Sequence, residues 1–266
     1  MKHTPFDHIA ATYDASFTNT PIGQLQRKLV WNYIEKIIPA LPGTEILELN
    51  CGTGEDAVLF SEKEFNIMAT DISEEMLKVT EKKVEQFSLQ QKVNLKYVDL
   101  ERFDETHFDK KFDLVFSNFG GLNCIQPESL KRFIQKMPAL LNPGGRLIAV
   151  IMPKYCLWES LYFILKFQFT KAFRRWTNDE VQANLNGTIT SAWYYNPATI
   201  QGWSKEILSV IDYRPVGLTL PPSYMEKYFE SKNKTLMRLN SLEAKLTRFS
   251  SLSKFADHYV IDLKRL

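Results

Sequence analysis

Short apolar runs alternate with amphipathic stretches along much of the chain. Runs with the length and the β-branched or aromatic content of strands occupy residues 46–49, 67–70, 93–98, 112–117 and 146–152. The stretches between them repeat apolar side chains at helical spacing, at residues 55–63, 73–87 and 127–141. Because strands that alternate with helices build parallel sheets covered on both faces, this pattern predicts an α/β fold.

Capping residues support two of the predicted helices. Ser73 is suited to cap the helix that begins after it, and Glu74 and Glu75 place acids in its first turn, where they stabilise the helix dipole. An earlier helix at residues 23–38 ends where Pro39 prevents its continuation. We expect this earlier helix to pack against the sheet.

The pattern changes after residue 153. An aromatic-rich helical stretch comes first. It is followed by a predicted β-rich run, a helix, a strand, a long helical section and a last strand, at residues 188–195, 197–208, 210–220, 224–249 and 259–263. With 266 residues, of which 44% are hydrophobic, and with no internal repeat or linker, the chain is predicted to form a single domain.

Charge and cysteine content narrow the classes of partner and compartment. A formal net charge of +2 gives no reason to expect a polyanion, so nucleic acid is not expected as a partner. The cysteines Cys51, Cys124 and Cys156 form no CxxC pair, which argues against a disulfide framework and structural zinc. The N-terminus lacks an apolar signal region, and the apolar stretch at 157–169 is too short to span a bilayer. We expect a cytoplasmic protein without an integral membrane segment.

The histidines give no sign of a metal centre. His3, His8, His107 and His258 show no H-x-x-x-H spacing. No metal ligand is therefore predicted.

A glycine-rich turn joins the strand at residues 46–49 to the helix that follows it. Gly52 and Gly54 lack β-carbons, so the backbone can turn sharply and approach a ligand, while the start of the helix presents free N–H groups. A loop of this kind holds a nucleotide-like cofactor. Taken alone it also fits the dinucleotide fingerprint, because Ala57 stands where that fingerprint has its last small residue.

Three acids near the loop favour a cofactor that carries a cationic amino acid. Glu48, on the approach to the loop, would repel a pyrophosphate but can hold an ammonium group, directly or through water. Asp71 ends the second strand, about twenty residues further on, where a carboxylate can accept hydrogen bonds from both ribose hydroxyls. Asp99 follows the third strand beside Leu100. Its carboxylate can accept a hydrogen bond from an adenine amino group while apolar residues enclose the ring.

Residues 46–152 resemble the class I S-adenosylmethionine-dependent methyltransferases, and within them the type 11 small-molecule group that includes quinone-biosynthesis enzymes. The resemblance rests on ELNCGTG at 48–54, TDISEEML at 70–77, VDL at 98–100, FDLVFS at 112–117 and LNPGGRL at 141–147. An N-terminal segment is also similar to the one that folds over the cofactor in that group, through Phe6, Asp7, Ala10, Tyr13 and Asp14.

This resemblance implies a Rossmann-like α/β fold with a seven-stranded, mostly parallel sheet, helices on both faces and a helical, aromatic cover inserted after the fifth strand. It implies one methyltransferase domain over residues 1–266, made of an N-terminal lid and helix (1–42), a cofactor-binding core (43–153) and an acceptor cover with the last strands (154–266). The implied cofactor is S-adenosyl-L-methionine, with S-adenosyl-L-homocysteine as product. The implied activity is methyl transfer to a small, apolar or aromatic molecule.

The motif match also implies a set of cofactor-binding residues. They are Tyr13, Glu48, Asn50, Cys51, Gly52, Gly54, Asp71, Ile72, Met76, Asp99, Leu100, Asn118 and Phe119. Asn50 departs from the family, which usually has its first glycine there, but a small polar residue that tolerates left-handed backbone angles can fill that position. Asn118 and Phe119 follow the fourth strand, where this fold meets both the methionine moiety and the acceptor.

Methyl transfer from a sulfonium depends on alignment and the exclusion of water more than on a dedicated catalytic group. For a hydroxyl acceptor, His258, Tyr194 and Glu55 are the candidates for a general base, and a structural role stays open for His258. The sequence SNFG at 117–120 lacks the Asn/Asp-Pro-Pro-aromatic motif of exocyclic amino-N methyltransferases. This absence argues against methylation of adenine in DNA or glutamine in proteins.

An aromatic stretch at residues 158–176 is predicted to cover an apolar acceptor. Its basic rim, at Lys171, Arg174 and Arg175, offers a contact for a peripheral membrane surface or a carrier protein. Simple packing over the sheet edge is the alternative. Two other functions stay open: a catalytically silent methyltransferase-like binding subunit, and a NAD(P)-dependent oxidoreductase, which would leave Glu48 and Asp99 unexplained. No oligomeric state is indicated.

Overall fold

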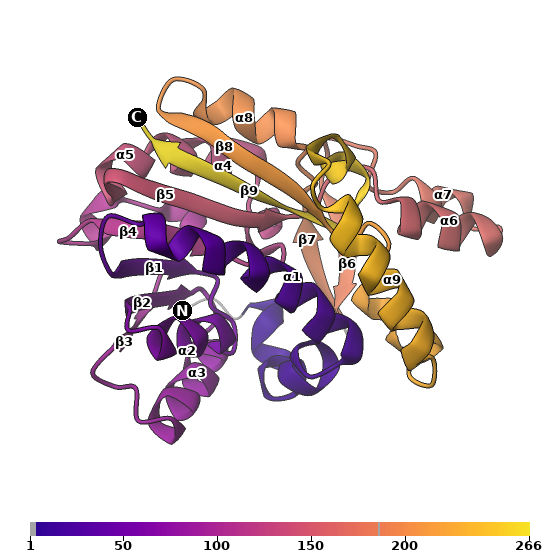
Figure 1. The fold of residues 1–266 in the computed structure, drawn as a ribbon, viewed down its shortest axis with the longest axis horizontal. Helices are drawn as coiled ribbons and strands as arrows, with labels where there is room; N and C mark the ends of the chain where they lie inside the picture. The colour runs from indigo at the N-terminus through magenta and orange to yellow at the C-terminus, as the bar shows by residue number, and fades with distance from the viewer. Residues whose placement is uncertain (1–3, 186) are drawn as a thin grey trace.

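The computed structural model describes residues 4–185 and 187–266, so His3 lies outside the described residues. Its centre is a seven-stranded sheet in the order β3-β2-β1-β4-β5-β9-β8 (Figure 1). In chain order the strands of this sheet are β1 (Glu45–Leu49), β2 (Asn66–Asp71), β3 (Val93–Tyr97), β4 (Phe112–Ser117), β5 (Leu141–Ile151), β8 (Leu208–Val216) and β9 (His258–Arg265). The first five pair in parallel, whereas β9 is antiparallel to both β5 and β8. The predicted seven-stranded, mostly parallel sheet is confirmed.

Helices cover both faces of the sheet. On one face lie α1 (Pro21–Ile37), α2 (Glu55–Glu62) and α3 (Glu74–Gln86), and the buried rings of Trp31 and Phe60 pack there with Phe116 of β4. On the other face lie α4 (Pro127–Gln135), α5 (Met137–Leu140) and α8 (Pro197–Ser204), where Phe133 packs with Leu147 of β5. Because both faces are buried, the central strands carry apolar residues on both faces.

Capping explains where two helices begin. The Oγ of Ser73 accepts a hydrogen bond from the Met76 N–H at 3.1 Å, so the predicted cap of α3 is confirmed. Thr20 caps α1 in the same way through the Gly23 N–H, and Pro21 occupies the first helical position.

Several predicted boundaries are wrong. The helix expected over 127–141 is two helices, because Pro138 lacks the N–H that would bond within a continuous helix. The fifth strand, expected at 146–152, already begins at Leu141 and so includes residues 142–145, since Leu141 pairs with Phe112 and an irregular register absorbs the extra residues. The helical section expected at 224–249 contains a 3-10 helix (Ser223–Tyr228) and α9 (Asn233–Leu246).

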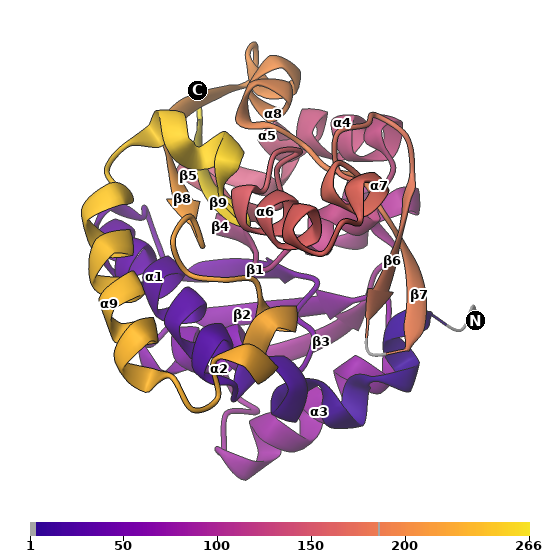
Figure 2. The same ribbon diagram turned by 90° about the vertical axis from the view of Figure 1, so that its right-hand side faces the viewer.

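The chain between β5 and β8 forms an insertion at one end of the sheet. It contains α6 (Leu157–Leu165), α7 (Phe169–Ala172), α8 and an antiparallel hairpin of β6 (Val181–Leu185) and β7 (Thr188–Ala192). The β-rich run expected at 188–195 therefore ends at Ala192, and its partner β6 is additional to the prediction. Figure 2 shows this hairpin descending toward the N-terminal segment, which β7 contacts at Pro5–His8.

Within the described ranges, no helix combines the length and the apolar character needed to cross a membrane.

Candidate functional site

The glycine-rich loop between β1 and α2 bends through three residues in the left-handed region. Asn50, Gly52 and Gly54 have φ angles of 53°, 56° and 76°. Asn50 therefore adopts the left-handed conformation expected of it, and its Oδ1 accepts a hydrogen bond from the Ser117 hydroxyl at 3.2 Å. A β-carbon on Gly52 would meet no atom within 4 Å, so the space over this residue is open to a ligand.

Asp71, the last residue of β2, ties this loop to the start of α3. One of its carboxylate oxygens accepts a hydrogen bond from the Gly52 N–H and the other from the Ser73 N–H, each at 2.9 Å. Burial raises the pKa of Asp71, although these backbone donors act in the opposite direction. Each oxygen keeps a second lone pair, so the carboxylate can still accept the ribose hydroxyls predicted for it.

Glu48 is a buried carboxylate with an unmatched oxygen. Only 2% of the residue is exposed, and its Oε2 has no hydrogen-bond partner among the described residues. Burial, reinforced by Asp56, raises the pKa of Glu48 well above its usual value despite the nearby Arg27. A cationic group that enters the loop would supply the partner that this acid lacks.

The N-terminal segment folds over this region. We call residues 4–20 the lid; it is built from three short helical turns, Pro5–His8, Ala10–Thr12 and Asp14–Thr18. Ile9 and Ala10 of the lid pack on Met76, which is 1% exposed. The ring of Tyr13 lies 5.7 Å from that of Phe17, and burial raises the pKa of Tyr13 to about 12, which keeps its hydroxyl neutral.

Polar contacts hold the lid against the loop and α3. The carboxylate of Asp14 accepts a hydrogen bond from the Thr53 hydroxyl at 2.6 Å and pairs with Lys83 at 3.0 Å. Asp7 accepts a hydrogen bond from the Ser73 hydroxyl at 2.6 Å. Since Thr53 belongs to the loop and Ser73 caps α3, these contacts close the lid over the carboxyl ends of β1 and β2.

A buried ion pair joins α1 to α2 behind the loop. Asp56 accepts hydrogen bonds from three side chains, those of Arg27 at 2.5 Å, Trp31 at 2.7 Å and Asn118 at 2.9 Å. The guanidinium of Arg27 also lies 5.0 Å from the ring centroid of Phe119. The side chain of Asn118 is therefore held by Asp56 of α2, and its Oδ1 accepts a hydrogen bond from the Phe119 N–H at 2.9 Å.

Tyr13, Phe17, Phe119 and His258 form a chain of ring contacts, which we call the aromatic wall, next to the end of β4. Phe119 meets Phe17 edge-on with ring centroids 5.0 Å apart, and it meets His258 edge-on at 5.8 Å. His258 begins β9, which is antiparallel to β5, so it lies at the sheet edge where β4 and β5 end.

His258 stands next to a buried charge network. Its Nδ1 is 3.2 Å from Oδ2 of Asp257. Burial would raise the pKa of Asp257, but His258 and Arg175 together lower it well below its usual value. Arg175 pairs with Asp257 at 3.1 Å and with Glu159 of α6 at 2.8 Å, and all three are buried. The network links the insertion to the first residue of β9.

Tyr194, the second candidate base, belongs to the same region. It is 4% exposed, and the guanidinium of Arg175 lies 4.9 Å from its ring centroid. Burial raises the pKa of Tyr194, so its hydroxyl stays protonated near neutrality and is a poor base.

The remaining predicted residues lie at or near the same edge of the sheet. Asp99 follows β3, and its Oδ1 accepts the Glu101 N–H at 3.0 Å. Leu100 is buried in the core beside it, and Ile72 follows Asp71. Burial raises the pKa of Cys51 well above its usual value, which favours a packing role for this thiol. Ligand contacts of these residues stay predictions.

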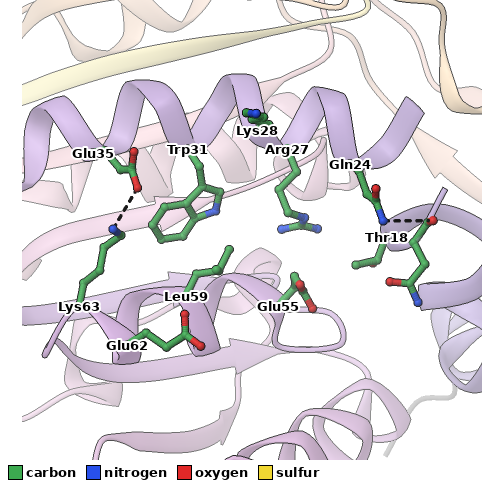
Figure 3. Close-up of a pocket in the computed structure, with 11 residues that line it drawn as sticks. Thr18, Gln24, Arg27, Lys28, Trp31, Glu35, Glu55, Leu59, Glu62 and Lys63 are labelled. Carbon is green, nitrogen blue, oxygen red and sulfur yellow. Dashed lines mark hydrogen bonds and ion pairs between the residues drawn. The ribbon is translucent and has the colours of Figure 1, made fainter. Parts of the chain in front are cut away.

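A cavity of about 570 Å³ opens elsewhere, between α1 and α2 (Figure 3). Trp31 of α1 and Leu59 of α2 point into it, and an ion pair between Glu35 and Lys63 spans it at 3.0 Å. Its lining has three acidic and three basic residues and none of the predicted cofactor-binding residues. We assign the site to the strand ends instead, because α/β sheets bind ligands in the crevice outside the carboxyl ends of their strands.

Sequence reasoning missed several residues that shape this site. Asp14 stood in the N-terminal motif and its partner Thr53 in the glycine-rich motif, which were the available signals, whereas its other partner, Lys83, lies in no motif. Arg27 and Asp56 are 29 positions apart, and neither lies in a recognisable motif. Among the described residues, no three His, Cys, Asp or Glu side chains gather in a way that could hold a metal ion.

Sequence comparison relates the core of this site to known enzymes. Residues 46–145 match the family model described as a methyltransferase domain. A demethylmenaquinone methyltransferase from Clavibacter sepedonicus is 28% identical over 144 residues, which are 54% of this chain and 54% of that protein. The chain thus aligns with little more than half the length of the first curated relatives it matches.

Solved structures share the whole fold. An S-adenosylmethionine-dependent methyltransferase from Clostridium acetobutylicum has a TM-score of 0.59 at 17% identity, over 98% of this chain and 99% of that one. Magnesium protoporphyrin IX methyltransferase from Synechocystis, solved with bound S-adenosylhomocysteine, has a TM-score of 0.58 at 15% identity, over 92% and 85% of the two chains. At such identities the likeness shows the fold, and the resemblance predicted from the motifs is confirmed.

Proposed function

We propose that this protein transfers the methyl group of S-adenosyl-L-methionine to a small, apolar or aromatic molecule, because residues 46–145 match the family model of a methyltransferase domain. Glu48 carries this proposal, since it is a buried acid with an unpartnered oxygen on the strand that leads into the open loop. A cofactor with an ammonium and a sulfonium group matches such an acid, whereas the pyrophosphate of NAD would be repelled by it.

The three parts of the chain have distinct tasks in this proposal. Residues 1–42 form the lid and the first helix, residues 43–153 bind the cofactor, and residues 154–266 cover the acceptor and complete the sheet. They act as one methyltransferase domain.

The cofactor is held by the predicted set of residues. The loop at Asn50, Gly52 and Gly54 receives the methionine moiety, with Glu48 facing its ammonium group. Asp71 accepts the ribose hydroxyls, and Asp99 with its neighbours Leu100, Ile72 and Met76 encloses the adenine. Tyr13, Asn118 and Phe119 surround the transferable methyl group. The neutral hydroxyl of Tyr13 and the side-chain amide of Asn118, which is held by Asp56, support these roles.

Most of the chemistry consists of positioning. When bound, S-adenosyl-L-methionine supplies an electrophilic methyl group on a positively charged sulfur. The lid excludes water, and the aromatic wall orients an aromatic acceptor. For a hydroxyl acceptor, Nε2 of His258 takes the acceptor's proton, and the Asp257 carboxylate, 3.2 Å from Nδ1, stabilises the imidazolium that forms.

An aromatic ring is the acceptor that suits this site best. The relative from Clavibacter sepedonicus is named a demethylmenaquinone methyltransferase, and the aromatic wall offers edge-on contacts to the ring of a quinone. We place the reaction in the cytoplasm, where the three free cysteines stay reduced. Nucleic acid is not a substrate in this proposal.

Calorimetric titration with S-adenosylmethionine, S-adenosylhomocysteine and NAD tests the cofactor. We expect micromolar binding of both adenosyl compounds and none of NAD, with binding of S-adenosylmethionine weakened about tenfold or more in Glu48→Gln. Glu81→Gln, on the exposed face of α3, is the matched control. Absence of binding by either adenosyl compound would contradict the proposal.

Turnover separates an enzyme from a silent binding subunit. Methyl transfer from labelled S-adenosylmethionine to a panel of quinols, phenols and aromatic amines should give a labelled product. Tight cofactor binding without transfer to any acceptor would favour the silent subunit instead.

A further inference from the structure

The insertion after β5 exposes an unusual concentration of apolar side chains. Among the described residues, eighteen large hydrophobic side chains are exposed, and eight of them lie between residues 157 and 176. Every residue from 164 to 171 is exposed, and this run includes Leu165 at 70%, Phe167 at 83% and Phe169 at 56%. Isolated exposed hydrophobic residues need no explanation, but a contiguous set of this kind marks a contact surface.

These side chains lie on α6, α7 and the turn between them, which we call the apolar tip (residues 157–173). Figure 1 shows the two helices projecting from one end of the molecule, and Figure 2 shows them facing outward, away from the sheet. The turn holds Phe167 at a φ of 54°, an unfavourable conformation for a bulky residue. The fold therefore presents an aromatic ring to the surroundings at a point where no packing compensates for its exposure.

The exposed charged residues of the apolar tip, Lys166 and Lys171, carry the same sign, since the acid Glu159 is buried. Between residues 160 and 178 the sequence contains Lys166, Lys171, Arg174 and Arg175 and no acidic residue. The two arginines neutralise the buried Glu159 and Asp257, whereas no carboxylate among the described residues forms an ion pair with Lys166 or Lys171. Two exposed lysines therefore flank the exposed rings of Phe167 and Phe169.

Aromatic residues from a second element extend this surface. Tyr224 and Tyr228 are 44% and 48% exposed, and the hydroxyl of Tyr228 lies 3.3 Å from that of Tyr162 on α6. Lys166 donates hydrogen bonds to both hydroxyls of that pair. Exposed phenylalanines with tyrosines and lysines at their margin are typical of surfaces that enter the boundary between headgroups and acyl chains.

We propose that the apolar tip binds the surface of membranes that contain anionic lipids, with Leu165, Phe167 and Phe169 entering the interface and Lys166 and Lys171 contacting the headgroups. A second copy of the tip is a poorer partner, because self-association would bring the like charges of both copies together. The contact is peripheral, since α6 has only nine residues. The inference goes beyond the proposed methyl transfer and does not depend on it.

Flotation with lipid vesicles tests this inference without any acceptor or cofactor. The full-length protein should float with vesicles of phosphatidylcholine mixed with phosphatidylglycerol, float much less with phosphatidylcholine alone, and lose binding as salt increases. Phe167→Asn with Phe169→Ser should lower binding about tenfold or more, and asparagine tolerates the left-handed turn at residue 167. Lys171→Glu should lower binding about tenfold.

Matched variants elsewhere on the surface serve as controls. Phe87→Ser with Ile211→Ser removes two other exposed apolar side chains, at 50% and 47% exposure, and Lys82→Glu makes the same charge change on α3. These variants should bind vesicles like the unaltered protein, and all variants should keep the same thermal unfolding and the same affinity for S-adenosylhomocysteine. No flotation of the unaltered protein, or equal flotation of the tip variants, would overturn the proposal. A dimer in sedimentation that the Phe167→Asn/Phe169→Ser variant abolishes would also overturn it, in favour of a second copy of the chain.

Discussion

The side chain of Asn50 fills the space that a β-carbon on Gly121 would need, at only 2.5 Å from the β-carbon of Asn50. Asn50 belongs to the glycine-rich loop, and Gly121 follows β4. Asn50 is also the residue that departs from the glycine usual in the family. The two positions are therefore coupled by steric contact across the sheet edge.

This contact predicts a compensating pair of substitutions. Gly121→Ala should destabilise the protein by about 1–3 kcal/mol, because the new methyl group overlaps Asn50. Asn50→Gly removes that overlap, so the double variant should recover most of the loss, with a coupling energy of about 1 kcal/mol or more. Chemical denaturation of the four proteins measures this cycle. Additive effects would show that the loop moves away instead.

We expect the ionised carboxylate of Glu48 to destabilise the folded protein, although it is the group proposed to bind the ammonium of the cofactor. Its pKa is raised in the folded state, so its ionisation opposes folding, and stability falls as pH rises from the unfolded pKa, near 4.5, toward the folded one. Glu48→Gln should therefore raise Tm at about pH 8 and leave it unchanged at about pH 4. Scanning calorimetry at the two pH values makes the comparison. A lower Tm at about pH 8 would show that the carboxylate has a partner of its own.

Arg175 should be among the most sensitive positions for stability. Arg175→Met leaves the carboxylates of Glu159 and Asp257 buried without this partner, a change that costs about 3–5 kcal/mol in comparable networks. The lowered pKa of Asp257 adds stability above its unfolded pKa, near 3.8, and this contribution is lost as pH falls through the folded value. Urea denaturation between about pH 7 and about pH 3 should show the difference between the proteins shrinking. A small difference in the free energy of unfolding that does not change with pH would contradict this prediction.

His258 and Tyr194 can be distinguished by their kinetics. With a hydroxyl acceptor, His258→Gln should lower kcat by about 10²- to 10⁴-fold, while the Kd of S-adenosylhomocysteine stays the same. Tyr194→Phe should change kcat little, because the raised pKa of Tyr194 keeps its hydroxyl protonated. The reverse result would assign the proton transfer to Tyr194.

The lid should control how fast the cofactor leaves. Asp14→Asn removes the ion pair with Lys83 and weakens the bond to Thr53, so dissociation of S-adenosylhomocysteine should become about tenfold faster with little change in Tm. Stopped-flow displacement measures the rate, and Asp109→Asn in an exposed loop is the control. Equal rates for both variants would show that these contacts do not govern closure.

Local patterns were sufficient to predict the sheet and the glycine-rich turn after its first strand. Strand and helix periodicity depends on residues two to four positions apart, and the cap at Ser73 and the left-handed turn at Asn50 depend on single residues. The same local logic failed at Pro138, where the missing N–H ends a helix that apolar spacing alone would continue. It also failed at β6, because the alternation of polar and apolar residues there is too weak to predict a strand.

The composition of the site beyond its motifs depended on tertiary structure. Asp56 meets Arg27 and Asn118, and Asp257 meets Arg175, only because the fold brings distant segments to one sheet edge. The sequence by itself determined the individual strands and helices, the glycine-rich loop and the acids beside it, because each depends on residues that are neighbours in the chain. Tertiary structure alone decided which of those acids is buried without a counter-charge, because burial and pairing depend on every element that packs around a side chain.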